Sequence, residues 1–285
     1  SGEHGPSVIA FFRSDKPTTG NGWSRYAEAL SAASRQTDAA AAARRAWASP
    51  DLSVADEGLI RARFWAALTS ADHDNRVDAL LFDKKPDSAA AALGYASPAR
   101  RAAFQARIAM HKSDPNSEAL FRSVEGQVAQ DAGLLMDRLR FLKDTYRNSA
   151  GARALAARPH RFVHRPADVD RWYEMMLILA RDAYNAGAWQ QAHSIASQVD
   201  DAFAPSTDVS DQSYAIRDNY TSLTWLAGQA TAPGVAGALG RILAGAFLAE
   251  LDGTWERLKA CSDDTCTSVF YDRSKNRSGK WCSMQ

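Results

Sequence analysis

Cysteine, an excess of one charge and long apolar runs are all scarce in this chain of 285 residues. The three cysteines all follow residue 260, so the body of the protein has no disulfide framework available to it. The formal net charge of +1 argues against a uniform field that attracts nucleic acid or an anionic membrane. The most apolar stretch, residues 238–251, contains Gly240, Arg241 and Gly245 and is too short to cross a bilayer. We therefore expect no membrane span and only local charge-driven binding.

Catalytic signatures are missing as well. The sequence contains no glycine-rich phosphate loop, no G-x-S-x-G elbow and no H-E-x-x-H helix. Glycoside hydrolysis usually requires two carboxylates placed across a sugar, and the adjacent Asp200 and Asp201 are more simply explained as a helix end that faces water. After Glu174 the only glutamates are Glu250 and Glu256. We therefore predict no catalytic residue and no organic cofactor.

Helix-start signals are abundant, and two of them lie in residues 53–82. Ser53 precedes Asp56 by three residues and Thr69 precedes Asp72 by three, so each pair can form a capping box. Apolar residues then recur at helical spacing in both segments. They are Ile60, Phe64, Ala67 and Leu68 in the first segment, and Val77, Leu80 and Leu81 in the second. These patterns predict a helical hairpin with one buried side.

The helical pattern continues on both sides of this hairpin. Ser97 and Asp114 each precede a proline, the arrangement of an N-cap residue followed by proline at the first helical position. Pairs of helices recur at spacings of roughly 30 to 40 residues, which is typical of an α-solenoid, although no strict repeat can be aligned. The predicted fold class is therefore all-α, as a solenoid of helical hairpins.

Two further segments have simple interpretations. The alanine-rich run 39–48 has high intrinsic helix propensity and is expected to form a surface helix. Residues 158–168 contain two prolines and several arginines, and they are expected to form a basic, solvated loop. His160 and His164 lie in this loop without helical spacing, so a metal site there is not expected.

The run E-G-L-I-R-A-R-F-W-A-A-L-T-S-A-D-H-D-N-R-V-D-A-L-L-F, residues 57–82, resembles the superhelical domain of soluble lytic murein transglycosylases. The resemblance continues through residues 106–110, 136–142 and 217–228 and delimits an expected domain at residues 1–229. It implies a right-handed α-superhelix that associates with peptidoglycan glycan strands in the periplasm. In that family a separate lysozyme-like domain carries the catalytic glutamic acid, and its Glu-Ser motif is missing here. The resemblance therefore implies a scaffold whose own enzymatic activity is uncertain and not expected.

A second segment, residues 230–285, begins with a helix and ends in C-S-D-D-T-C-T-S-V-F-Y-D-R-S-K-N-R-S-G-K-W-C-S-M-Q. This run resembles the C-terminal CGNR zinc finger of bacterial transcriptional regulators. Cys261 and Cys266 form a C-x4-C pair, and Cys282 begins a second pair whose last cysteine would lie two positions beyond Gln285. Closed structural zinc sites need four ligands, so we expect Cys261, Cys266 and Cys282 as ligands with the fourth missing. Water or a distant histidine would complete the site; an empty, frayed tail is the alternative.

The same tail concentrates positive charge. Residues 269–285 contain four bases against the single acid Asp272, with Phe270, Tyr271 and Trp281 between them. The bases are Arg273, Lys275, Arg277 and Lys280. Interleaved bases and aromatic rings can bind the phosphate backbone of a nucleic acid. The simpler interpretation, which we favour, is that the aromatics form the small core of a ribbon and the bases its solvated face.

Three hypotheses follow. The chain is a non-catalytic helical scaffold that associates with peptidoglycan in the periplasm, or a zinc-dependent DNA-binding regulator in the cytoplasm. The third hypothesis is a fused or truncated chain, natural or engineered, without independent activity. The chain starts at Ser1 with neither methionine nor an apolar signal, which indicates a processed or trimmed N-terminus.

Overall fold

The helix starts predicted at Ser53 and Thr69 are both present in the computed structural model. The structure describes residues 4–198, 228, 230–251, 253–262, 266, 268–274 and 279–280. Thr69 forms a complete capping box with Asp72 at the start of helix α5 (Ser70–Phe82). Ser53 caps α4 (Val54–Phe64) from one side only, because its backbone N–H donates to Asn21 instead of to the carboxylate three residues later. Both helices therefore begin where expected, but the hairpin predicted between them is wrong, because each of the two packs on other helices.

The described residues are mostly helical, with a small two-stranded sheet near the C-terminus, so the predicted all-α class with a small tail is confirmed. The other α-helices are α1 (His4–Ser14), α2 (Gly20–Ala32), α3 (Gln36–Ala48), α6 (Pro86–Ala92), α7 (Pro98–His111), α8 (Ser117–Val124), α9 (Ala132–Arg140), α10 (Ser149–Ala156), α11 (Val169–Asn185), α12 (Trp189–Ala196) and α14 (Gly234–Leu251). Short 3₁₀ turns are η1 (Trp65–Ala67), η2 (Leu93–Tyr95), η3 (Glu125–Gln127) and η6 (Trp255–Arg257), and η4 (Phe141–Thr145) is a π-helical turn. The strands are β1 (Leu258–Ala260) and β2 (Val269–Tyr271).

The described chain divides into two units within α11. Unit 1 comprises the described residues up to Met175, and unit 2 those from Met176 onward. The boundary predicted between residues 229 and 230 stays a prediction, because residues 199–227 and 229 lie outside the described part of the chain. Among the described residues, no helix combines the length and the apolar character that a membrane span requires.

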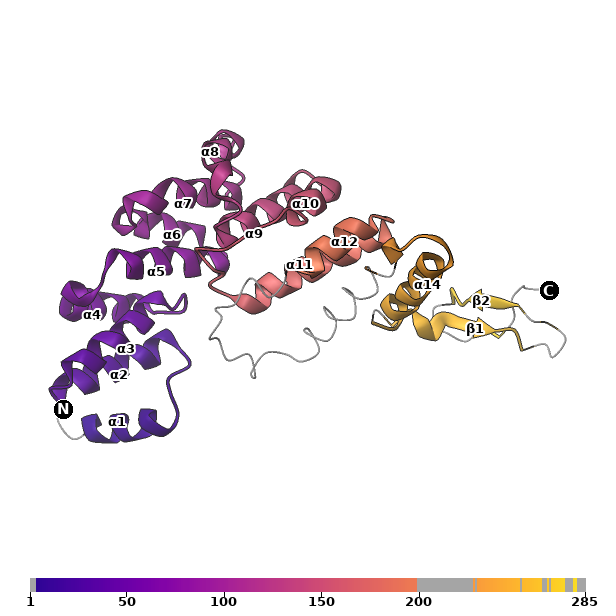
Figure 1. The fold of residues 1–285 in the computed structure, drawn as a ribbon. Coiled ribbons are helices and arrows are strands. Elements are labelled where there is room, and N and C mark those ends of the chain that lie inside the picture. Colours follow the sequence, from indigo (N-terminus) through magenta and orange to yellow (C-terminus); the bar gives the residue numbers. More distant parts are fainter. Residues whose placement is uncertain are drawn as a thin grey trace. The chain divides into compact units, whose positions relative to one another are not determined.

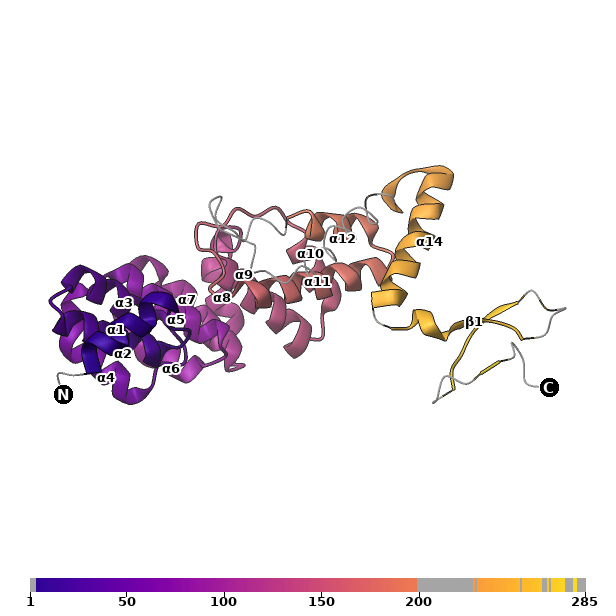
Figure 2. The same ribbon diagram turned by 90° about the horizontal axis from the view of Figure 1, so that it is seen from below.

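Unit 1 is built from helical hairpins that follow one another in chain order (Figures 1 and 2). Helix α2 packs against α3, and α7 against α8 and α9. Helix α4 packs on α2 and α3, whereas α5 packs on α3, α6 and α7. The same turn closes three hairpins, with Ser34, Lys84 and Ser113 in the left-handed region at φ values of 61°, 58° and 51°. In each turn two backbone N–H groups bond back to the last helical carbonyls, as in the Schellman cap. This shared turn supports the predicted solenoid of hairpins; its handedness stays a prediction.

Two apolar clusters of described residues contribute to the core of unit 1. One combines residues of α2, α3 and α4 around Trp47, and the other combines residues of α5, α6 and α7 around Phe104. Both rings are fully buried, and burial of a large aromatic side chain contributes roughly 2–3 kcal/mol. The expectation that residues 39–48 form a simple surface helix is wrong, because one face of α3 is buried and the helix packs on α2. The buried alanines are Ala39, Ala42, Ala43 and Ala46. Their small side chains allow the two helices to approach closely.

The irregular segment 158–168 is only partly solvated. Arg161 and Arg165 are exposed, as expected for a basic loop. His160, however, is 5% exposed, and its ring stacks on Phe162 with centroids 4.4 Å apart and meets the edge of Trp172. The expectation of a solvated His160 is therefore wrong, because an aromatic cluster at the start of α11 encloses it.

Unit 2 contains helices and the small sheet. Tyr184 and Trp189 pack at a ring-centroid distance of 4.5 Å, and the Tyr184 hydroxyl donates to the backbone oxygen of Arg241 on α14 at 2.7 Å. Burial raises the pKa of Tyr184 to about 12. The helix expected to run from Val235 through Leu251 into the following T-W-E-R-L-K-A-C is confirmed up to Leu251 as α14. Its expected continuation is wrong, because residues 255–260 form η6 and β1 instead.

Candidate functional site

The two strands of unit 2 form an antiparallel ribbon that places two of the predicted zinc ligands in one loop. Leu258 pairs with Tyr271, and Ala260 pairs with Val269. Cys261 follows β1 directly, and its backbone N–H donates to the carbonyl oxygen of Ser268 at 3.0 Å. This bond closes the loop that contains Cys266. Both cysteine side chains are half-buried.

A third stretch of chain lies beside this loop. The backbone N–H of Ser262 donates to the carbonyl oxygen of Lys280 at 2.8 Å. The chain therefore returns to the residue that follows Cys261. Cys282, two positions after Lys280 in the sequence, lies outside the described residues.

Asp272 organises the ribbon. Its carboxylate is 3% exposed and accepts hydrogen bonds from the Lys259 ammonium at 2.7 Å, the Gly279 N–H at 2.8 Å and the Ser274 N–H at 2.9 Å. Its backbone N–H donates to the carbonyl oxygen of Arg257 at 2.7 Å, and the Arg257 guanidinium donates back to the Asp272 carbonyl at 2.9 Å. The bond from Lys259 comes first among the causes that hold the pKa of Asp272 well below its usual range. One carboxylate thus joins β1, β2 and the returning segment.

The predicted basic residues divide into two groups. Arg273 and Lys280 are described and exposed, whereas Lys275 and Arg277 lie outside the described residues. Two bases not singled out from the sequence, Arg257 and Lys259, are held by Asp272 and its backbone, so their role is structural. Of the predicted aromatic core, Phe270 is half-buried and Tyr271 is 46% exposed.

The chemistry of the donor set fits zinc in part. Thiolates are ligands that zinc prefers, and Cys261 and Cys266 supply two of them in one loop. Within the described part of the chain, no group of three or more histidines, cysteines and acids is close enough to hold a metal ion. The described residues therefore supply two thiols in one loop, fewer than the four ligands that a closed tetrahedral zinc site requires.

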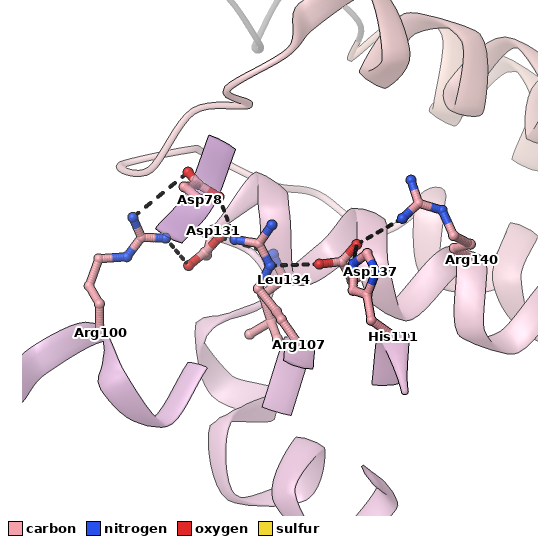
Figure 3. Close-up of polar contacts among 8 residues, drawn as sticks. All are labelled: Asp78, Arg100, Arg107, His111, Asp131, Leu134, Asp137 and Arg140. Carbon is pink, nitrogen blue, oxygen red and sulfur yellow. Dashed lines mark hydrogen bonds and ion pairs between the residues drawn. The ribbon is translucent and has the colours of Figure 1, made fainter. Parts of the chain in front are cut away.

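A different polar cluster, which the sequence did not reveal, crosses unit 1 (Figure 3). Arg107 on α7 is fully buried; it donates through Nη1 to Asp78 on α5 and through Nε to Asp137 on α9, the latter at 2.7 Å. Arg100, two helical turns earlier on α7, donates to Asp131 at 2.7 Å. Asp131 also caps α9 by accepting from the Leu134 N–H at 3.0 Å. The cluster joins three helices through charge-assisted hydrogen bonds.

The cluster ends at Asp137. Its Oδ1 atom lies 2.9 Å from His111 Nε2 and accepts from Arg140 Nη1 at 3.2 Å. Burial alone would raise the pKa of Asp137, but the charge of Arg107, with help from His111 and Arg140, lowers it to about 2. Burial raises the pKa of Asp78, which has fewer cationic partners. Asp137 is therefore the firmly ionised carboxylate of the cluster.

Unit 1 also exposes an aromatic cluster formed by Trp65, His73 and Tyr95. Trp65 on η1 is 36% exposed and Tyr95 on η2 is 40% exposed, with ring centroids 4.9 Å apart. The His73 ring lies 4.8 Å from that of Trp65, and the Arg61 guanidinium lies 5.3 Å from that of Tyr95. Burial lowers the pKa of His73 and so favours its neutral form. Both exposed rings belong to short turns at helix ends, where apolar periodicity gives no signal.

Comparison with known proteins identifies only the tail. Residues 257–285 match the CGNR zinc finger family. No curated protein and no solved structure is significantly similar to the chain. These comparisons give no support to the resemblance between residues 1–229 and lytic transglycosylases. The C-terminal segment, with Cys261, Cys266 and Cys282, is therefore similar to a CGNR zinc finger.

Proposed function

We propose that the C-terminal ribbon binds zinc and contacts nucleic acid. The observation that carries this proposal is the position of Cys261 and Cys266 in the loop of a ribbon that lies within the matched residues 257–285. Cys282, which lies outside the described residues, would supply a third thiolate, because it follows Lys280 by two positions and the Lys280 carbonyl accepts from the N–H of Ser262, the neighbour of Cys261. When bound, zinc would be a structural cross-link between the strands and the returning segment.

Zinc would supply stability that the ribbon's own side chains do not. The two strands have three residues each, and Leu258, Val269 and Tyr271 on one face are 41%, 69% and 46% exposed. A segment with so small a core usually depends on a metal, disulfides or association with a partner. Asp272 aligns the three stretches of backbone, and the metal would hold the loop end of the ribbon.

The nucleic-acid part of the proposal rests on exposed bases. Arg273 directly follows Asp272, and both its side chain and that of Lys280 face solvent. Exposed guanidinium and ammonium groups can neutralise backbone phosphates, and the 46% exposed Tyr271 ring can stack on a base. In this proposal the protein would act in the cytoplasm as a regulator, with the helical body as a second, separate part.

The zinc proposal is tested by elemental analysis of the full chain, purified with zinc and then dialysed. We expect about one zinc per chain, lost in Cys261→Ser and Cys266→Ser and retained in Ser262→Ala, a neighbour on the same loop. Cobalt in place of zinc should give thiolate charge-transfer absorption in the native chain and less in each cysteine variant. A chain that retains no zinc, or retains it equally in both cysteine variants, would contradict the proposal.

The nucleic-acid proposal is tested by binding of the zinc-loaded chain to duplex DNA over a range of salt concentrations. Arg273→Ala and Lys280→Ala should each weaken binding, and each should reduce the slope of log K against log salt by about 1 if it removes one phosphate contact. Arg122→Ala, an exposed base on α8 of unit 1, is the matched control and should have no effect. Binding that is absent, or equally strong in all variants, would contradict the proposal.

A second function is favoured by the aromatic cluster of unit 1. Exposed Trp65 and Tyr95 rings with Arg61 beside them offer apolar faces for sugar rings and a donor for their hydroxyl groups. The helical body would then be a scaffold that associates with glycan strands of peptidoglycan, and the protein would work in the periplasm. No catalytic residue is proposed for it.

This second proposal is tested by co-sedimentation with purified cell-wall sacculi. Trp65→Ala and Tyr95→Ala should each reduce the bound fraction at least several-fold. Trp255→Ala removes a ring of similar exposure, 49%, from unit 2 and should leave binding unchanged. Equal loss in all three variants, or no binding by the native chain, would contradict it.

A further inference from the structure

A pocket of about 270 Å³ opens in unit 1 where the buried charge cluster reaches the surface. Its walls include Lys84 from the α5–α6 turn, His111 and Ser113 from the end of α7, and Arg140 and Thr145 from α9 and η4. Figure 3 shows His111 and Arg140 reaching the same carboxylate, Asp137, which also lines the pocket. Neither the ribbon nor the aromatic cluster contributes to this pocket, so its function is independent of both proposals above.

The pocket has more donors than acceptors. Lys84 is exposed, and its ammonium forms no hydrogen bond or ion pair with the described residues. Arg140 uses only Nη1 on Asp137, which leaves the rest of its guanidinium, with a side chain 18% exposed, for another partner. His111 binds Asp137 through Nε2, and its Nδ1 atom bonds to no described residue. Three nitrogen-bearing side chains therefore surround one cavity.

The two acidic side chains of the pocket are already paired with other cations. The Asp137 side chain is 3% exposed, and Arg107, which it shares with Asp78, binds it from the buried side through the 2.7 Å bond to Nε. Asp144 is 59% exposed, and its carboxylate lies 3.7 Å from the ammonium of Lys143. Lys84 thus has no ion-pair partner among the described residues, and Arg140 keeps the donors that its ion pair with Asp137 leaves open. Ser113 and Thr145 are neutral hydroxyl-bearing neighbours.

The backbone around the pocket is unusual in two places. Lys84 and Ser113, the positive-φ residues of two hairpin turns, both line the pocket. Helix α9 then widens into the π-helical turn η4, a feature that is rare and frequent at functional sites. Thr145 closes this turn. Three separate elements of unit 1 thus contribute lining residues to one cavity.

From this arrangement we infer that the pocket binds a small oxyanion, either a phosphate group or a carboxylate, through Lys84, Arg140 and His111. A planar guanidinium and an ammonium group at one cavity can donate hydrogen bonds to the two or three oxygens of such an anion. The buried Arg107–Asp137 pair fixes Asp137, and Asp137 in turn orients His111 and Arg140. The ligand sits at the end of a rigid polar network, which satisfies the requirement that a binding site be preorganised.

The test is titration of the full chain with inorganic phosphate and, separately, with acetate, with sodium chloride at matched ionic strength as a control. Binding is measured by calorimetry and by the NMR signals of the His111 ring, assigned from His111→Gln. We expect saturable binding of one anion per chain and a shift of the His111 signals that chloride does not produce. Saturation by phosphate or by acetate decides between the two ligand classes, and either result supports the inference.

Variants separate a pocket from general ion binding. Lys84→Ala and Arg140→Gln should each weaken anion binding and raise its dissociation constant about tenfold or more, because each removes a charged donor. Lys112→Ala is the matched control: this lysine pairs with Asp87 at 2.6 Å and does not line the pocket. Lys84 is exposed and can be replaced without disturbing the core, so it decides the matter if Arg140→Gln does not fold. No saturable binding, or equal binding by native chain and Lys84→Ala, would overturn the inference.

Discussion

The polar core of unit 1 and the ribbon of unit 2 both contain a buried carboxylate among hydrogen-bond donors. The two carboxylates differ in which parts of the chain supply those donors. Asp137 receives Arg107, His111 and Arg140 from two helices, and apolar clusters surround the helices of this unit. Asp272 receives Lys259 and two backbone N–H groups from a short stretch of chain with an exposed apolar face. Unit 1 is therefore expected to be stable by itself, and the ribbon is expected to depend on a metal.

The largest effect should follow loss of Arg107. Arg107→Ala leaves Asp78 and Asp137 buried without their shared partner, and an uncompensated buried charge costs about 3–5 kcal/mol. Urea unfolding of the full chain, followed by the helical circular dichroism signal, measures this loss. Arg122→Ala, exposed on α8, should change the free energy of unfolding by less than about 0.5 kcal/mol. If the two variants unfolded alike, the buried cluster would not stabilise unit 1.

The second effect is a decrease in the free energy of unfolding of unit 1 at acidic pH. The folded-state pKa of Asp137 is about 2, below its ordinary value of 3.8. Its contribution to the free energy of unfolding is therefore fully present above about pH 4 and is lost as the pH falls toward 2, by about 2 kcal/mol. Unfolding curves between pH 5 and 2 measure this loss. Asp137→Asn should flatten the dependence, whereas Asp170→Asn at an exposed position should leave it unchanged; equal slopes in both variants would contradict the assignment.

Much of unit 1 could be predicted from the sequence, because helix caps and apolar spacing are local signals. Thr69 and Ser53 marked helix starts correctly, although the Asp114-Pro115 pair did not open a helix at Pro115, since α8 begins at Ser117. The Asp114 carboxylate instead accepts from the Asn116 N–H in a turn before the helix. Such shifts arise because several residues near a proline compete for the same cap.

The buried charges could not be predicted from spacing alone, although one signal was present. Arg100, Phe104, Arg107 and His111 recur at i, i+4, i+7 and i+11, so three polar side chains share the buried face of α7 with an aromatic ring. Their partners Asp78 and Asp137 lie about 30 residues away on other helices, and only tertiary structure brings them together. The cysteine pair of the ribbon was predictable for the opposite reason, since its spacing is local.

A smaller effect is expected at Gly133, where the buried cluster meets the backbone of α9. A Cβ atom there would lie 2.7 Å from Arg107 Nη2 and closer still to Nη1, so Gly133→Ala must displace the guanidinium. Overpacking of this kind costs about 1–3 kcal/mol, and the higher helix propensity of alanine offsets about 1 kcal/mol of it. In the Arg107→Ala background only the propensity gain should remain. Urea unfolding of the four chains of this double-mutant cycle measures the coupling, and additive effects would contradict the close contact.

The smallest effect on the stability of the helices is expected from a substitution in the ribbon. Asp272→Asn removes the ion pair with Lys259 and weakens the acceptor of the Ser274 and Gly279 N–H groups, so hydrogen exchange at those two amides should become faster. Because the pKa of Asp272 is lowered, the same acceleration should occur in the native chain only as the pH falls below the ordinary range of an aspartate. Ser268→Ala, an exposed neighbour, is the control. The unfolding midpoint of the helices should not change, since the partners of Asp272 all lie within the ribbon; a shift of that midpoint would show that the two units stabilise each other.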